Sequence, residues 1–347
     1  MKPPVDIRVI INPASAARKT TGRIYAIVAS LEREFPGRCQ VALTRAPGDA
    51  EELARRGVLD GVSLLVCVGG DGTLNEVING MLAAAGGTLP ETSLGLISSG
   101  SGQGFAQSVR LPGVLQEQVG LLGARRARPV DLGAVTVEDG SEGQRTRYFI
   151  NECQIGIGAD VVRGSRKLGK SAGGLISYGL ATVGAIFRSP NVDAALSIDG
   201  GQPEGSSLLG LCIGNGDLTG GGMSLTPGAR VDDGLLNLLT IHGLSLGGRL
   251  RSFPRIYTGR HVTLPGFSHR TVRQCSVEGP VPLPVTVDGE EIGRTPCQIR
   301  IVERALMVIL PDHHERARSE LVAMTREHHE KATAELTAMP PDQNERE

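Results

Sequence analysis

The architecture of the chain follows from residues 62–82, VSLLVCVGGDGTLNEVINGML. The first seven residues form a continuous apolar run, which is typical of a strand buried on both faces of a parallel sheet. From Leu74 to Leu82, apolar residues recur at helical spacing. The loop Gly69–Thr73 therefore lies between a buried strand and a helix. This places it at the carboxyl end of the strand, where open α/β sheets bind ligands.

The chemistry of this loop indicates phosphate binding. Its three glycines let the backbone approach a ligand closely, and the N-terminus of the following helix offers unpaired N–H groups. The loop has no Gly-Lys-Ser/Thr sequence and no G-x-G-x-x-G spacing, so neither a Walker loop nor a dinucleotide fingerprint is present. Asp71 would repel phosphate unless it binds Mg²⁺, a Mg²⁺-bound water or a hydroxyl. The alternative is a tight turn with a capping Asp.

The rest of the first third alternates strand and helix patterns. Residues 7–11, 39–44 and 93–98 are predicted strands, and Asp49 with Glu52 predicts a helix N-terminal capping box. A second glycine loop, residues 98–106, again follows a strand, although a plain turn would explain it as well. The alternation predicts an α/β domain with a mainly parallel sheet.

Beyond Pro129, short strand patterns are separated by turn clusters, apart from residues 161–187 and a helix expected near 245–258. We therefore expect an α/β domain over residues 1–129 and a β-rich domain over 130–300. The charged segment 313–347 is interpreted as a solvated helix with a disordered end.

Composition limits the function classes. A length of 347 residues suggests two domains. The chain has a net charge of -1, no Trp, and only six Phe and four Tyr, which argues against a nucleic-acid partner. The six cysteines form no C-x-x-C pair, so buried reduced thiols are expected rather than disulfides or zinc. The N-terminus has no secretory signal pattern, and we expect a cytoplasmic location.

The uncharged segment Ser171–Phe187 could contact a membrane. It is flanked by Arg166, Lys167 and Lys170 on one side and by Arg188 on the other. It is shorter than the about 20 residues that a spanning helix needs. We therefore expect a buried or interfacial helix, with a peripheral association at the inner face of the membrane.

The motif G-G-D-G-T-L-N-E-V-I-N-G resembles the nucleotide-binding motif of the diacylglycerol kinase catalytic-domain family, which includes bacterial lipid kinases, sphingosine kinases and ceramide kinases. The resemblance covers about residues 7–310. It is carried further by a set of shorter motifs in family order: Asn12-Pro13, Thr44, Gly214-Asn215-Gly216, Gly220–Met223, Pro227–Leu236 and Val287–Glu290.

The resemblance implies a Rossmann-like N-terminal nucleotide domain and a β-sandwich C-terminal domain, α/β plus β overall. The last strands, about 301–312, would return to the first domain. ATP and lipid would meet in the cleft between the domains. The implied nucleotide-binding residues are Asn12, Thr44, Gly69, Gly70, Asp71, Gly72, Thr73, Asn75, Glu76 and Ser101.

The resemblance also implies catalytic and metal-binding residues. Asp71 would orient Mg²⁺ or its water, and Glu290 would accept the proton of the lipid hydroxyl. Because Glu291 is adjacent, the alignment with the family motif leaves open which of the two glutamates is the base. A structural Mg²⁺ would be held by Asp233 and the carbonyls of Arg230 and Leu235. From the residues alone, Asp233 and the Asp288-Gly289 pair can equally be turn residues.

The sequence departs from the family pattern at several positions. Ala16 stands where Gly is usual, Ser98 replaces Pro, Ser101 replaces Thr, and Gln103 replaces Asn. Gly104 replaces an Asp that many bacterial diacylglycerol kinases have, which weakens the case for diacylglycerol as substrate more than the case for kinase activity.

We expect an ATP- and Mg²⁺-dependent kinase acting on a hydroxyl of a membrane lipid, either diacylglycerol or a sphingoid or related lipid. One alternative is an NAD kinase, where an Asn-Glu pair comes much later in the chain than Asn75-Glu76. Another is a non-catalytic protein that binds lipid or nucleotide. The oligomeric state is open, a homodimer included.

Overall fold

The computed structural model describes residues 6–15, 20–99, 103–138, 143–168 and 174–312. Ala16, Ser101 and the tail 313–347 lie outside these residues. The α-helices are α1 (Thr20–Glu34), α2 (Asp49–Leu59), α3 (Asp71–Ala84), α4 (Gly104–Ser108), α5 (Leu115–Ala124), α6 (Ile157–Leu168), α7 (Gly174–Arg188) and α8 (Leu246–Ile256), with short 3-10 helices at Pro13–Ser15 and Arg260–Thr263. The strands are β1 (Ile7–Ile11), β2 (Cys39–Leu43), β3 (Leu64–Gly69), β4 (Ser93–Ser98), β5 (Ala127–Glu138), β6 (Gln144–Phe149), β7 (Glu152–Gly156), β8 (Val192–Ile198), β9 (Glu204–Gly214), β10 (Leu236–His242), β11 (Phe267–Val272), β12 (Gln274–Glu278), β13 (Pro284–Val287), β14 (Glu290–Arg294) and β15 (Cys297–Ile309).

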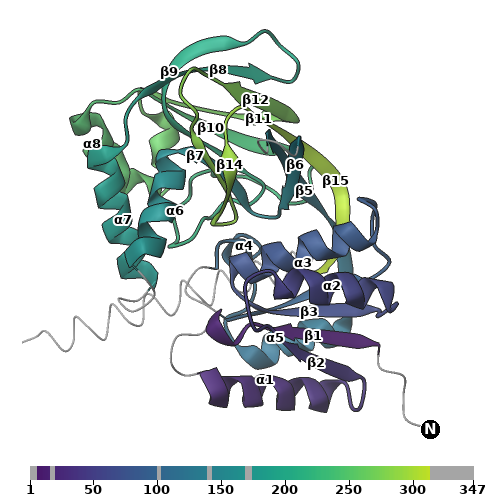
Figure 1. Ribbon diagram of the computed structural model, residues 1–347. Coiled ribbons are helices and arrows are strands. Elements are labelled where there is room, and N and C mark those ends of the chain that lie inside the picture. The colour runs from purple at the N-terminus through teal and green to yellow at the C-terminus, as the bar shows by residue number, and fades with distance from the viewer. Residues whose placement is uncertain (1–5, 16–19, 100–102, 139–142, 169–173, 313–347) are drawn as a thin grey trace, which may run out of the picture. The chain divides into compact units, whose positions relative to one another are not determined.

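The N-terminal half is a parallel sheet covered by helices on both faces. Its strand order is β4-β3-β1-β2, and every neighbouring pair is parallel. The side chains of β1 and β3 alternate between the two faces. One face packs on α1 and α5, and the other packs on α2 and α3, as Figure 1 shows. Burial on both faces explains why residues 64–69 are continuously apolar or small.

The C-terminal half is a β-sandwich. Its strands run in the order β14-β13-β7-β9-β8-β12 and continue to β15. Four strands lie off this path: β10 pairs with β9 and β11, and β5 pairs with β15 and β6. The inner faces bury aliphatic side chains from β5, β7, β9, β12, β13 and β15. The helices α6, α7 and α8 lie together on one side of the sandwich (Figure 1). These findings confirm the predicted fold class, α/β plus a β-sandwich.

The strand β15 connects the two halves. Near its start it pairs with β12, and near its end Val308 pairs in parallel with Leu94 of β4. It pairs with β5 along most of its length, with a register shift between Val302 and Leu306. The segment expected to return to the first domain is therefore the second half of this strand. The domain boundaries themselves stay a prediction.

Two local predictions can be compared with the helices. The capping box at Asp49 is wrong: Gly48 is the N-cap, and Glu52 pairs with Arg55 and Arg56 instead of returning to the helix N-terminus. Residues 174–187 of the uncharged segment lie within α7. Among the described residues, the structure contains no helix that is long and apolar enough to cross a membrane.

Candidate active site

The predicted nucleotide-binding residues lie along one edge of the parallel sheet. Asn12 follows β1, Thr44 follows β2, and Gly69 ends β3. The backbone N–H of Thr44 donates to the carbonyl of Ile11, and that of Ser99, after β4, donates to the carbonyl of Gly69. The carboxyl ends of four adjacent strands thus meet at a single edge, which is the ligand edge of open α/β sheets. Ser101 lies outside the described residues.

Asn12 holds the glycine loop. Its Nδ2 donates to Thr73 Oγ1 at 2.8 Å, and its Oδ1 accepts from the N–H of Ala14 at 2.9 Å. Gly69 is required for this contact, because a β-carbon there would lie 2.6 Å from the Thr73 β-carbon. Gly70 is the extended N-cap of α3, so the first-turn N–H groups of α3 are available beside the loop.

Asp71 ties the two glycine loops together. Its carboxylate accepts from the N–H of Gly104 at 3.0 Å and from the N–H of Phe105 at 3.3 Å. Burial raises the pKa of Asp71, and these two hydrogen bonds oppose the rise. The geometry orients both carboxylate oxygens, and a hard cation such as Mg²⁺ prefers oxygen ligands of this kind.

Glu290 approaches the glycine loop from the β-sandwich. Its Oε1 lies 3.3 Å from the position that a β-carbon on Gly72 would occupy. Glu291 faces elsewhere, since its Oε1 accepts from Arg163 at 3.2 Å. The structure therefore brings Glu290, rather than Glu291, next to the predicted phosphate loop.

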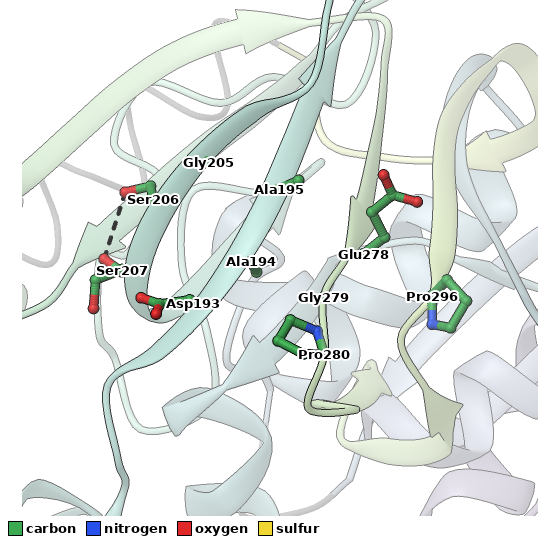
Figure 2. Close-up of a pocket in the computed structure, with 10 residues that line it drawn as sticks. All are labelled: Asp193, Ala194, Ala195, Gly205, Ser206, Ser207, Glu278, Gly279, Pro280 and Pro296. Carbon is green, nitrogen blue, oxygen red and sulfur yellow. Dashed lines mark hydrogen bonds between the residues drawn. The ribbon is translucent and has the colours of Figure 1, made fainter.

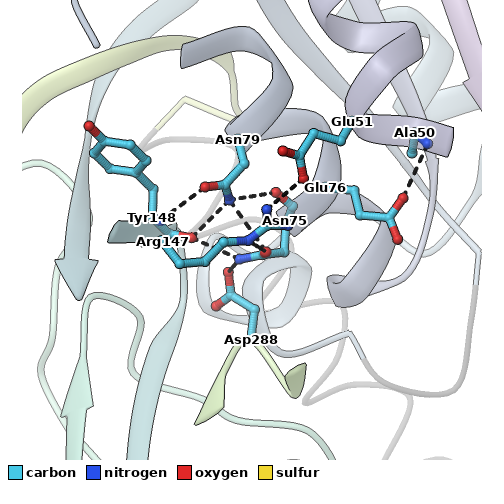
Figure 3. Close-up of polar contacts among 8 residues, drawn as sticks. All are labelled: Ala50, Glu51, Asn75, Glu76, Asn79, Arg147, Tyr148 and Asp288. Carbon is cyan, nitrogen blue, oxygen red and sulfur yellow. Dashed lines mark hydrogen bonds and ion pairs between the residues drawn. The ribbon is translucent and has the colours of Figure 1, made fainter. Parts of the chain in front are cut away.

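Asn75 and Asn79 belong to a buried polar network between α3 and the C-terminal half (Figure 3). Asn75 Nδ2 donates to the carbonyl of Tyr148 and to Asp288 Oδ2, both at 2.9 Å, while its Oδ1 accepts from Arg147 Nε at 2.9 Å. Asn75 has no exposed surface. Its predicted role in nucleotide binding stays a prediction, but its side chain is already engaged with protein groups.

Glu76 also makes a contact within the protein. Its Oε2 accepts from the N–H of Ala50 at 3.1 Å, in the first turn of α2 (Figure 3). A carboxylate at a helix N-terminus compensates the unpaired N–H groups and the helix dipole. The pattern Asn-Glu therefore contributes to helix packing here, and binding of the nucleotide by Glu76 stays untested.

Asp288 anchors the turn that carries Glu290. Its carboxylate accepts from Asn75 and from the backbone N–H groups of Ile150, Asn151 and Glu152, each at about 3.0 Å. Asp288 and Gly289 both have positive φ, as the Asp-Gly turn pattern indicates. Burial raises the pKa of Asp288 to about 6 in spite of the four donors. Asp288 is thus both a residue of the hairpin turn and a buried carboxylate that holds this turn in position.

The predicted metal loop lies at the start of β10. Asp233 is exposed, and its Oδ1 accepts from the N–H of Leu235 at 3.1 Å. Asp131, buried in β5, accepts from the N–H groups of Gly234 and Arg304. Within the described ranges, no three His, Cys, Asp or Glu side chains are placed to hold a metal. A cation at Asp233 would thus need backbone carbonyls, as the family resemblance implies, and this site stays a prediction.

The departure at Gly104 has a structural consequence. A β-carbon there would lie 2.7 Å from Asn151 Nδ2 and 3.2 Å from the carbonyl of Leu218. Asn151 Nδ2 itself donates to that carbonyl at 3.0 Å. A side chain at position 104 would therefore have to displace the Asn151 amide from its contact with Leu218.

Several residues of this region were not predicted from the sequence. Arg23 of α1 donates to the carbonyl of Ser98 at 3.1 Å and brings a positive charge to the ligand edge. Asn151-Glu152 is a second Asn-Glu pair, about 75 residues after the first, and it lies beside Asp288. An Asn-Glu pair late in the chain is the feature expected of NAD kinases, so the position of this motif no longer separates an NAD kinase from a lipid kinase.

An apolar pocket lies between β9, β10 and the helices α6, α7 and α8. Most of its lining is aliphatic or aromatic, and Gln154 of β7 is among its polar members. A second hollow lies over β8, β9 and β12 and includes the carboxylates Asp193 and Glu278 (Figure 2). None of the predicted site residues lines this second hollow.

Comparisons with known proteins agree with the fold and the motifs. Residues 6–135 match the diacylglycerol kinase catalytic domain, and residues 153–310 match the YegS C-terminal NAD kinase beta sandwich-like domain. A Xanthomonas euvesicatoria protein named "Probable lipid kinase YegS-like" is 31% identical over 273 residues, 78% of this chain and 86% of the relative. The "Diacylglycerol kinase" of Staphylococcus carnosus is 26% identical over 304 residues, 88% of this chain and 94% of the relative.

A solved structure supports the same fold. The crystal structure of a diacylglycerol kinase from Bacillus anthracis str. Sterne superposes with a TM-score of 0.65 at 20% identity, covering 88% of this chain and 97% of that chain. The chain therefore belongs to the diacylglycerol kinase catalytic-domain family of lipid kinases, and it is a kinase.

Proposed function

We propose that this kinase transfers the γ-phosphoryl group of ATP to a hydroxyl of a membrane lipid, with Mg²⁺ as cofactor. The observation that carries the proposal is the placement of Glu290 against Gly72. A carboxylate from the β-sandwich lies next to the glycine loop of the α/β half, which supports a proton acceptor beside the proposed phosphate site. Phosphoryl transfer asks mainly for such positioning and for charge neutralisation.

In the proposed mechanism, the first turn of α3 and the backbone of the glycine loop bind the phosphates. Glu290 takes the proton of the lipid hydroxyl while the lipid oxygen bonds to the γ-phosphorus. The bond from that phosphorus to the bridging oxygen breaks, and ADP leaves. Asp71 is oriented to hold Mg²⁺, which when bound would neutralise phosphate charge. Asp233 and the carbonyls of Arg230 and Leu235 would hold the structural cation.

The apolar pocket supports a lipid acceptor. It is lined by Ile157 and Val161 of α6, Ile186 of α7, and Phe253 and Ile256 of α8. A concave apolar site with few polar groups is the usual form of a site for an apolar ligand. We propose that an acyl or alkyl chain occupies it.

The helices α7 and α8 also offer a surface for a membrane. Leu180, Val183 and Phe187 of α7 are exposed, as are Leu246 and Leu250 of α8, and α7 packs against α8. Neither helix contains an acidic residue, whereas exposed arginines lie on both. We call this apolar and basic surface of α7 and α8 the docking face, and we propose that it contacts anionic lipid.

Turnover of labelled ATP tests the proposal. The acceptors are diacylglycerol, phosphatidylglycerol, sphingosine, ceramide, a polyprenol and NAD. We expect label in the organic phase with at least one lipid. NAD is included because, with Asn151-Glu152 present, the position of the Asn-Glu pair does not separate a lipid kinase from an NAD kinase. Label transferred only to NAD, or released only as phosphate, would overturn the proposed function.

A further inference from the structure

Glu152 is a buried carboxylate with one unpaired oxygen. It begins β7, where the next side chains on the opposite face, Cys153 and Ile155, fill the core of the sandwich. Glu152 as a whole is 6% exposed. Oε1 accepts from Gln154 Nε2 at 2.7 Å, and Oε2 has no hydrogen-bond partner. A buried acceptor without a partner is costly, and a donor supplied by another molecule would remove that cost.

The position of Glu152 joins the apolar pocket to the candidate active site. Gln154, which holds its Oε1, lines the apolar pocket. On the other side, the backbone of Glu152 donates to Asp288 Oδ1 and accepts from the N–H of Asp288. Burial raises the pKa of Glu152, and the nearby charges of Asp288 and Asp71 raise it further. Glu152 thus lies between Gln154, in the wall of the apolar pocket, and Asp288, which anchors the turn of Glu290.

The chemistry at this point favours a cation. The carboxyl groups of Asp71 and Asp288 lie close enough to Glu152 to disfavour its ionisation. The pocket that Gln154 lines beside Glu152 is mostly apolar, so an organic cation that carries an apolar chain suits this place. A primary ammonium supplies both the charge and the missing donor.

We propose that Glu152 binds the ammonium group of a long-chain amino alcohol, next to the hydroxyl that is phosphorylated, so that it selects this lipid class over diacylglycerol. The inference rests on the proposed function. Diacylglycerol has a single hydroxyl, which is the phosphoryl acceptor, and its ester oxygens only accept hydrogen bonds. It would therefore leave Glu152 Oε2 unpaired.

The kinetic test compares sphingosine with a diacylglycerol in the same mixed micelles. The wild-type kcat/KM ratio should favour sphingosine, and Glu152→Gln should reduce that ratio about 10- to 100-fold, mainly through KM for sphingosine. Glu278→Gln is the matched control, because Glu278 is an exposed carboxylate in the hollow of Figure 2. An unchanged ratio in Glu152→Gln would overturn the inference while leaving the kinase proposal intact.

A binding test works without turnover and on the unmodified protein. Calorimetry should show that dodecylamine binds about tenfold or more tightly than dodecanol, since only the amine brings charge to the carboxylate. Glu152→Gln should remove the difference, and Glu278→Gln should keep it. Equal affinity for amine and alcohol in the wild type would overturn the inference. If amine binding depends on Glu152 but no lipid is phosphorylated, the ammonium site is supported and the proposed function is overturned instead.

Discussion

Glu290 and Glu291 are neighbours in the chain with different surroundings, and this difference can be tested. Glu290→Gln keeps the shape and removes the basicity, so it should lower turnover about 10²- to 10⁴-fold with ATP affinity nearly intact. Glu291→Gln breaks only a partly exposed ion pair with Arg163 and should be mild. The measurements are steady-state kinetics and calorimetric ATP binding. A crippling effect of Glu291→Gln, with a mild one at Glu290, would show that Glu291 is the base.

Asp288 should make the stability of the protein depend on pH. Its folded pKa of about 6 lies above the value of an unfolded Asp, so the stability linked to it is present below about pH 4 and is lost as pH rises through 6. Asp288→Asn should cost about 2–3 kcal/mol at pH 4.5, because the amide nitrogen would face two donors, and unlike a carboxyl oxygen, protonated or not, it cannot accept from them. This cost should shrink by about 2–3 kcal/mol between pH 4.5 and 7.5.

Urea unfolding at a series of pH values measures this effect, and Asp199→Asn is the matched control. Asp199 also has positive φ and precedes Gly200 in a turn, and its Oδ1 accepts from the N–H groups of Arg273 and Gln274. An Asn oxygen can accept both bonds, so the cost of Asp199→Asn should be small. A cost of Asp288→Asn that grows with rising pH would contradict the predicted sign.

The glycine loop should tolerate no side chain on the side that faces Glu290. Gly72→Val fits the helical backbone, but its side chain would displace the Glu290 carboxylate and cover the N–H groups of the first turn. Gly70 has an extended backbone, so Gly70→Val should also obstruct the bound phosphates but should leave Glu290 in place. Both should weaken ATP binding about tenfold or more in calorimetry. Gly120→Val, with open space around it, is the control; unchanged ATP affinity at positions 70 and 72 would refute the phosphate-loop assignment.

At the scale of elements, the patterns that predicted structure correctly are local ones. The strand β3 and the helix α3 follow from the apolar run and the helical spacing around Gly69–Thr73. The contacts that complete the site are not local: Asn75 and Asp288 are 213 positions apart. Sequence spacing cannot show such a pair. It also misassigned Asp49, whose carboxylate accepts from the preceding N–H groups of Arg45 and Ala46, while Gly48 takes the N-cap position.

The loop between Arg230 and Leu235 should respond to Mg²⁺ as an element. Partial desolvation of the Asp233 carboxylate and the nearby carboxylate of Asp131 raise the pKa of Asp233, and a bound cation would offset both. Asp233→Ala should leave the melting temperature nearly unchanged in EDTA and remove the increase that Mg²⁺ gives the wild type. Asp232→Ala, which loses an exposed contact with Arg230, is the control. Normal Mg²⁺ stabilisation with lost turnover would place Asp233 in the active site.

At the scale of the whole molecule, β15 and the polar network make the candidate active site depend on both halves of the chain. One end of β15 contributes Leu306 and Val308 to the core under α2 and α3, and the other contributes Cys297 and Ile299 to the sandwich core. A strand shared between two cores disfavours large independent movements of the halves. The approach of Glu290 to Gly72 is thus fixed by the fold, whereas the substrate must reach it from outside.

The proposed membrane-lipid substrate would require the molecule to meet a membrane, and the docking face predicts how. Sedimentation with vesicles containing phosphatidylglycerol should show binding that weakens with salt, at about 1 kcal/mol per basic residue near the surface. Replacing Leu180 and Phe187 together by Ser should reduce binding, because each exposes a large apolar side chain on α7.

The matched control replaces Val41 and Val281, which are similarly exposed on other elements, by Ser. It removes apolar surface of the same kind from faces that lack the arginines of α7 and α8, so it should leave vesicle binding unchanged. Equal losses in both double variants would show that general surface hydrophobicity, and not the docking face, drives binding. Binding that ignores salt, or that only detergent reverses, would replace peripheral contact by insertion and would contradict the prediction.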